Sequence, residues 1–232
     1  MRGPALVLAA LAVLLGTAPA AAQVGTLPEE SPFRDIRFGH GFSLVVAQWA
    51  GDGGEVDVGP GDGTTFGIRY DLRISQPVSL SAAWSRGDFD RVIIDARAEP
   101  EEREAIPASE TLDLLDLTFQ FTLSGGKTWH GLAPFIGASL GLAIGDDIGD
   151  PSGYDFGNKV TFAPLIGARY FLGDRLFARF EFRGTFWKLS YPTSFTTSPT
   201  PNPADALLPG GPETEWVVNP SLHFGLGYSF DL

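Results

Sequence analysis

Hydrophobic and polar residues alternate one by one along most of this chain of 232 residues. The last segment shows the pattern most clearly: every second residue from Val218 to Leu232 is apolar or aromatic, and the residues between them are Asn, Ser, His, Gly and Asp. A period of two predicts a β-strand with one apolar and one polar face. Eight segments share this period: 40–48, 64–74, 78–85, 115–123, 132–144, 160–172, 176–187 and 218–232.

The connections between these segments alternate in length. Residues 75–77, 124–131 and 173–175 are short connections, whereas 49–63, 86–110, 145–158 and 190–214 are long and rich in Gly, Pro and acidic residues. If the strands run up and down, all short connections lie at one end and all long ones at the other. This layout is typical of a transmembrane β-barrel with tight turns at one rim and long loops at the other.

The two faces of the strands indicate which side meets lipid. One face is almost entirely apolar and aromatic, and the other carries Gly, Ser, Thr and full charges. A soluble barrel such as a lipocalin also alternates, but its interior is apolar and its exterior is polar. Charged side chains among glycines suit the crowded interior of a narrow barrel. We therefore predict an all-β fold, an eight-stranded antiparallel up-and-down transmembrane β-barrel; a soluble barrel or sandwich is the alternative.

Aromatic residues near the strand ends support this orientation. Transmembrane barrels carry a girdle of aromatic side chains at each membrane interface. We expect one girdle toward the long-loop rim and another toward the short-turn rim. The first contains Trp84, Phe186 and Trp216, and the second contains Phe121, Tyr170, Tyr228 and Phe230.

The N-terminus has the features of an export signal. Arg2 precedes twelve apolar residues at 5–16, and the small residues Ala20 and Ala22 predict cleavage before Gln23. Twelve residues are too few to span a bilayer, which needs about 20. We therefore expect a signal peptide at 1–22, a periplasmic N-terminal leader at 23–39 and an outer-membrane β-barrel at 40–232.

Composition excludes several classes of function. The chain has no Cys, which excludes disulfides, a Cys-ligated zinc site and a thiol nucleophile. Its 28 acidic and 16 basic residues give a net charge of −12, which argues against a nucleic-acid partner because phosphate binding needs a basic surface. We expect no cofactor.

Charged residues on the polar face are the strongest candidates for a functional site. A charge buried in a narrow barrel is costly unless it is paired. We expect a central network in which Glu181 and Asp116 accept hydrogen bonds from arginines. Such a network either fills a closed interior or forms a gate or charge-selective constriction. The predicted lumen charges are Arg69, Asp71, Arg73, Asp116, Arg169, Arg179, Glu181 and Arg183.

Two other groups of residues invite a chemical interpretation. Two loops are rich in acidic residues: Asp52, Glu55, Asp57 and Asp62 in one, and Asp146, Asp147, Asp150 and Asp155 in the other. Acidic side chains can bind Ca²⁺. Neither loop has the spacing of an EF-hand, so we expect solvated loops and no metal site. Ser221 and His223 share a face, as a nucleophile and its base would, yet no carboxylate nearby in the sequence supplies the third group. We therefore predict no catalytic residues.

The C-terminal segment 222–232 resembles the closing strand of Gram-negative outer-membrane proteins. In that group the barrel-assembly machinery recognises alternating hydrophobic residues that end in an aromatic residue. Here the last residue is Leu232 instead, with Phe230 two residues before it. The resemblance implies an assembly signal formed by Phe224, Leu226, Tyr228, Phe230 and Leu232.

As a whole, the exported chain resembles the small eight-stranded outer-membrane β-barrels of the OmpA-transmembrane-like and OmpW-like group. The resemblance implies contact with outer-membrane lipid and lipopolysaccharide and with the barrel-assembly machinery. It favours a structural or surface-interaction role, with a passive channel for small or hydrophobic solutes as the alternative. A lipid-modifying barrel enzyme and a secreted lipocalin-like binder are weaker hypotheses. The sequence indicates no oligomeric state.

Overall fold

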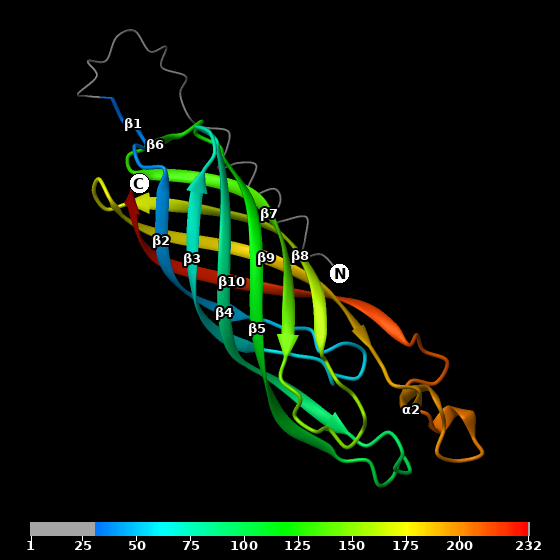
Figure 1. The fold of residues 1–232 in the computed structure, drawn as a ribbon. Helices are drawn as coiled ribbons and strands as arrows, with labels where there is room; N and C mark the ends of the chain where they lie inside the picture. Colours follow the sequence, from blue (N-terminus) through cyan, green and yellow to red (C-terminus); the bar gives the residue numbers. More distant parts are fainter. Residues whose placement is uncertain (1–30, 232) are drawn as a thin grey trace, which may run out of the picture. The chain divides into compact units, whose positions relative to one another are not determined.

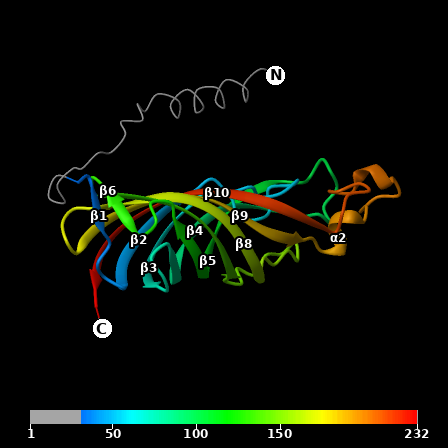
Figure 2. The ribbon, with the colours of Figure 1, turned by 90° about the horizontal axis from the view of Figure 1, so that it is seen from above.

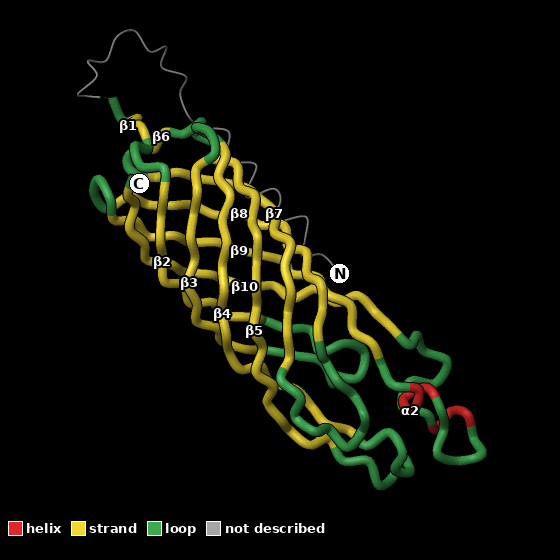
Figure 3. Tube along the Cα trace, in the orientation of Figure 1, coloured by secondary structure: helices red, strands yellow, loops and turns green. Residues whose placement is uncertain are grey.

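The computed structural model describes residues 31–231, and residues from Phe33 onward form one unit. The predicted signal peptide, the first part of the predicted leader and Leu232 lie outside the described residues. Within the described part, strands dominate and the two helical segments, α2 (Thr193–Thr196) and η1 (Pro203–Asp205), are short (Figure 3). No helix in residues 31–231 is long and apolar enough to cross a membrane.

Eight antiparallel strands close into a ring (Figures 1 and 2). The ring closes where the first of these strands pairs with the last, from His40 opposite Phe230 to Trp49 opposite Ser221. The predicted eight-stranded up-and-down barrel is therefore confirmed. Its strands are β2 (His40–Trp49), β3 (Gly63–Arg73), β4 (Val78–Ile94), β5 (Ala105–Thr122), β7 (Leu132–Gly145), β8 (Asn158–Phe171), β9 (Leu176–Ser190) and β10 (Thr214–Phe230).

Two further strands lie at the short-turn end. β1 (Phe33–Asp35) pairs with β6 (Lys127–Trp129), which lies within the connection between β5 and β7. Arg73 holds the residues that follow β1 by donating hydrogen bonds to the backbone carbonyl oxygens of Ile36 and Arg37. The chain just before the barrel is thus held against the short turns.

The connection predicted over 86–110 is shorter in the structure and spans only residues 95–104. β4 continues to Ile94 and β5 begins at Ala105, and their ladder pairs every residue from Gly87–Leu112 to Ile94–Ala105. The alternation continues beyond the apolar band: Asp88 and Asp90 face outward, and the inward residues are Phe89, Arg91, Glu110 and Leu112. The high charge density suggested a loop, although the period of two was still present.

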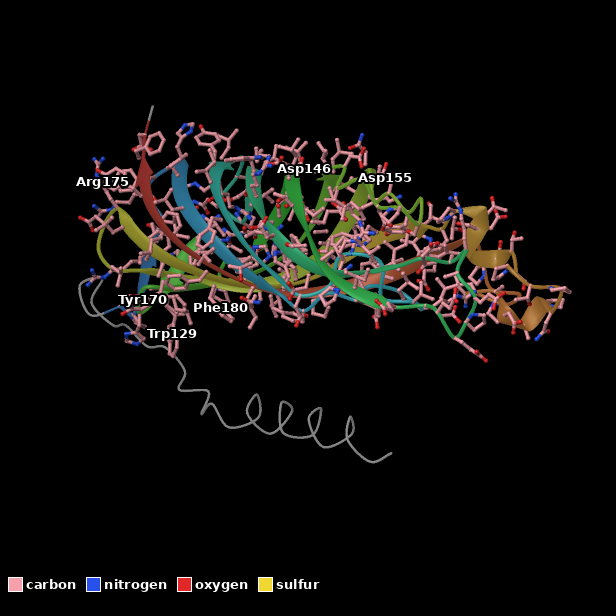
Figure 4. The ribbon with its side chains drawn as sticks, turned by 90° about the horizontal axis from the view of Figure 1, so that it is seen from below. Trp129, Asp146, Asp155, Tyr170, Arg175 and Phe180 are labelled. Carbon is pink, nitrogen blue, oxygen red and sulfur yellow. The ribbon has the colours of Figure 1, made fainter. Side chains whose placement is uncertain are left out.

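The outward face forms an apolar band. Large hydrophobic side chains are exposed on all eight strands of the ring, among them Phe66, Leu117, Phe180 and Phe224. Figure 4 shows Tyr170 and Phe180 projecting from the wall. Toward the long loops the band gives way to polar outward residues: Gln48, Thr64, Arg86, Asp113, Asp146, Asn158, Lys188 and Thr214.

The polar residues that end the band mark the outer limit of the lipid-facing surface. Arg86 lies 2.6 Å from Asp113 and 2.8 Å from Asp146, and the Trp84 indole donates to Asp113 at 3.0 Å. Such exposed ion pairs fit the water side of a membrane interface, and a Trp whose N–H reaches the polar side is typical of that depth. Residues beyond this limit, including the ends of β4 and β5, lie outside the membrane.

We expect Leu117→Arg to destabilise the barrel by about 2–4 kcal/mol, because its side chain lies near mid-height of the lipid face. The matched control is Leu176→Arg at the short-turn rim, where the same change should cost about 0–1 kcal/mol. Urea-dependent unfolding in lipid vesicles measures both. Equal losses at the two depths would contradict a lipid-facing band.

Candidate functional site

A network of buried charges fills the middle of the lumen. Glu181 on β9 is its central acceptor: Arg179 Nε donates to Glu181 Oε2 at 2.9 Å, and Arg183 donates to Glu181 Oε1. Arg69 Nη1 from β3 lies 3.7 Å from Glu181 Oε2. Arg183 Nη1 also lies 3.3 Å from Asp116 Oδ2 on β5. The network therefore joins strands that lie well apart in the ring.

A second acceptor, Asp71, lies closer to the short turns. Arg69 Nε donates to Asp71 Oδ1 at 3.1 Å, and Arg169 Nη2 from β8 reaches the same oxygen at 3.1 Å. Ser81 also donates to it at 2.6 Å. Arg179 Nη1 lies 3.6 Å from this oxygen, so Arg179 lies between the two acceptors.

The β-strand period explains why these groups meet. Arg179, Glu181 and Arg183 are spaced by two on β9, and Arg69 and Asp71 are spaced by two on β3, so each set faces inward. The side chains of all five are no more than 4 % exposed. Charges buried to this degree are tolerated only when they are paired and hydrogen-bonded.

The structure brings seven of the eight predicted lumen charges together. The exception is Arg73, which faces the short-turn rim and binds the carbonyl oxygens of Ile36 and Arg37. Gln120, which the sequence analysis did not single out, accepts from Arg179 Nη2 at 2.6 Å. Its inward position on β5, four residues from Asp116, was the signal available in the sequence.

An apolar layer fills the lumen on the loop side of the charges. Trp49 stacks on Trp187 with ring centroids 6.1 Å apart and meets Phe89 edge-on at 5.7 Å. Phe156, from the loop between β7 and β8, packs edge-on against Trp187 at 5.6 Å. The predicted polar face did not include this layer, although Trp49, Phe89 and Trp187 all occupy inward positions of the alternation.

All four long loops contribute to this apolar layer. The β2–β3, β4–β5, β7–β8 and β9–β10 connections each contribute at least one buried apolar side chain. Each of the loops is thereby anchored to the barrel wall. The anchoring residues are Val58, Ala96, Tyr154, Phe156, Phe195 and Leu208.

Outside the membrane a second buried ion cluster ties the loops together. Arg91 Nη1 lies 2.8 Å from Glu110 Oε2, and Arg91 Nη2 lies 2.6 Å from Asp150 Oδ2 in the loop between β7 and β8. Tyr154 stacks under the Arg91 guanidinium. Burial raises the pKa of Glu110 above its usual value and exceeds the opposing effect of Arg91. Asp150, expected to be solvated, is instead 1 % exposed in its side chain.

The other acidic loop residues make local contacts. Asp62 accepts a hydrogen bond from the Gly51 amide, and Asp52 accepts from Gly54. Asp147 and Asp155 accept from the amides two residues ahead of each. Within residues 31–231 no group of three or more His, Cys, Asp or Glu side chains is arranged to hold a metal ion.

Ser221 and His223 do meet in the lumen. Ser221 Oγ and His223 Nε2 are 2.9 Å apart, and Trp49 lies edge-on to the imidazole. Within the described residues no carboxylate accepts a hydrogen bond from this histidine. A nucleophile and base without an orienting group, buried among arginines, lack the arrangement that acyl transfer needs.

The predicted girdle residues all lie on outward positions. Trp84 and Trp216 are exposed near the loop end of the band, and Phe186 is half-buried against Phe162. At the short-turn end Phe230 is half-buried and stacks on His40. Exposed aromatic residues at this end are Phe121, Tyr170 and Tyr228. Of the residues expected to form the assembly signal, Phe224, Leu226 and Tyr228 are exposed.

Glu181→Gln is expected to destabilise the barrel by about 3–5 kcal/mol, because it leaves Arg179 and Arg183 without their shared carboxylate in a buried site. Urea-dependent unfolding in detergent or lipid measures the loss. The control is Asp113→Asn, which removes an exposed ion pair with Arg86 and should cost about 1 kcal/mol or less. A Glu181→Gln barrel as stable as the control would contradict a network that stabilises the lumen.

A scan against protein-family models and a search of curated protein sequences gave no significant match. Solved structures do resemble the chain. The outer membrane protein OprG from Pseudomonas aeruginosa is 13% identical, with 88% of this chain and 100% of that chain covered and a TM-score of 0.52. Neisserial surface protein A is 14% identical, with 86% and 98% covered and a TM-score of 0.49.

The likeness to OprG agrees with the ring of eight strands and with the outward apolar band. At this level of identity the likeness concerns the fold. The chain has the fold of the small eight-stranded outer-membrane β-barrel proteins.

Proposed function

We propose that this chain is a closed outer-membrane barrel with a structural or surface-interaction role, which holds an ordered set of long loops at the cell surface. The observation that carries the proposal is that two successive layers fill the lumen. The first is the charged network around Glu181, and the second is the apolar layer around Trp187.

Two small cavities lie in the lumen of the described part of the chain. One, lined by Arg69, Glu181 and His223 among others, has a volume of about 20 Å³, and another near the short-turn rim has about 20 Å³. Such volumes hold about one water molecule. A larger hollow of about 890 Å³ lies on the outward side of β3 and β4, beside Phe66 and Trp84, and not in the lumen. A passive channel would need a continuous water path past Arg69 and Glu181.

The loops are held in place by buried contacts, as a binding surface displayed outside the cell requires. Each inserts apolar side chains into the same layer, and Arg103 of the loop between β4 and β5 donates to the Asp205 carbonyl oxygen of the loop between β9 and β10. Arg91 and Asp150 join two further elements. Pre-ordered loops lose less conformational entropy when they bind a partner. This favours a surface role over a transport role.

In planar lipid bilayers the purified barrel is expected to give no steady unitary conductance. The two filled layers leave no path for hydrated ions. A barrel of known pore-forming type in the same bilayers serves as the positive control. Reproducible conductance steps from this protein would contradict the closed barrel and favour the passive channel.

Surface display is tested by protease treatment of intact cells. Phe195→Ser removes a buried anchor of the loop between β9 and β10 and should make this loop several times more sensitive to external protease. The control Thr197→Ser changes an exposed residue nearby and should leave the wild-type cleavage rate. Cleavage only after the cells are lysed, in wild type and variant alike, would contradict loops that face the exterior.

A further inference from the structure

The buried charges in the lumen do not balance. Within the described residues four guanidinium groups, those of Arg69, Arg169, Arg179 and Arg183, face three carboxylates, those of Asp71, Asp116 and Glu181. One positive charge is in surplus. An Arg side chain keeps its proton in proteins, so the surplus cannot be removed by deprotonation.

A buried charge without a counter-charge is strongly unfavourable in a medium of low dielectric constant. Arg169 is 13 % exposed in its side chain, but the side chains of Arg69, Arg179 and Arg183 are only 2–4 % exposed, so solvent screens these three little. The apolar layer separates them from the loop side of the barrel. The surplus charge therefore calls for a negative partner within the lumen.

The lumen contains a cavity next to the surplus charge. It has a volume of about 20 Å³ and is lined by Arg69, Arg179 and Arg183, by Asp116 and Glu181, and by hydroxyl-bearing Thr65 and Ser85. The three guanidinium groups and two carboxylates that line the cavity have a net charge of +1. The volume holds about one water molecule, which favours a monatomic anion over sulfate, phosphate or an organic anion.

One buried guanidinium nitrogen beside this cavity lacks a hydrogen-bond acceptor. Arg179 Nη1 is buried and has no hydrogen-bond partner, its nearest carboxylate oxygen being Asp71 Oδ1 at 3.6 Å. Thr65 Oγ1 accepts from the Trp49 indole at 3.1 Å, so the proton of this hydroxyl remains available for donation. Glu181 and Asp116 are already engaged by arginines. Donors and positive charge together define a site for an anion.

We propose that this cavity binds one small monovalent anion of chloride size, which supplies the fourth negative charge of the network. The anion accepts hydrogen bonds from guanidinium and hydroxyl groups that otherwise lack an acceptor. Because the apolar layer covers the loop side of the cavity, the anion is bound within the folded lumen. It is then a component of the folded lumen and not a transported solute.

The first test is urea-dependent unfolding of the detergent-solubilised barrel in sodium chloride and in sodium gluconate at equal ionic strength and pH. Urea is used because guanidinium chloride would supply the ion. Chloride should stabilise the barrel in a saturable manner. At a hundred times its dissociation constant it should shift the unfolding equilibrium about a hundredfold. Equal stability in the two salts would overturn the proposal.

A designed variant separates a specific site from a general salt effect. Gln120 is 1 % exposed and accepts from Arg179 Nη2 at 2.6 Å, so Gln120→Glu places a carboxylate of the same shape beside that guanidinium. With four carboxylates for four guanidinium groups, this variant should lose the stabilisation by chloride. The matched control Gln48→Glu, on the outward face, should keep it. Loss of the chloride effect in both variants or in neither would overturn the proposal.

Bromide locates the ion directly. Crystals of wild-type protein refolded in sodium bromide should show an anomalous peak within hydrogen-bond distance of Arg69, Arg179 or Arg183. The peak should be absent from Gln120→Glu crystals prepared in the same way. Ordinary water density at this position in wild-type crystals, with bromide found only on the outer surface, would overturn the proposal.

Discussion

Charges that point into an eight-stranded barrel must find partners within the lumen, and this constraint governs the structure. Glu181 accepts from two arginines of its own strand and lies near Arg69 across the lumen. Asp71, nearer the short turns, accepts from Arg69 of its own strand and from Arg169 of β8. Replacing either carboxylate by an apolar group would leave guanidinium groups buried and unpaired. The placement of β3 relative to β9 across the lumen is therefore coupled to the chemistry of these side chains.

The same alternation serves a second purpose further along the strands. Beyond the lipid-facing band many inward positions are aromatic or aliphatic, and many outward positions are polar or charged. In this part the barrel is built like a soluble protein, with an apolar interior and a polar exterior. The loops complete that interior with Val58, Phe156 and Phe195. Lipid-facing and water-facing parts thus share one set of strands.

Much of the fold could be predicted from the sequence because the barrel depends on a local period of two. The strand positions, the closed ring, the outward band and the inward position of Glu181 all follow from that period. The extension of β4 and β5 was missed, since a dense run of charges at 88–104 resembles a loop when judged by composition. The pairing of Arg91 with Asp150 could not be predicted, because loop conformation brings together residues that are 59 apart.

The closed ring also imposes an order on synthesis and assembly. β2 finds one of its two neighbours only in β10, so His40 pairs with a residue 190 positions later in the chain. Such long-range pairing is slow because a large loop must be closed before any contact is gained. Until β10 joins, both β2 and β9 present open edges that could pair with other chains. A chain that lost its final strand would therefore lose one seventeen-residue element and also the protection of two edges, which makes it prone to aggregation.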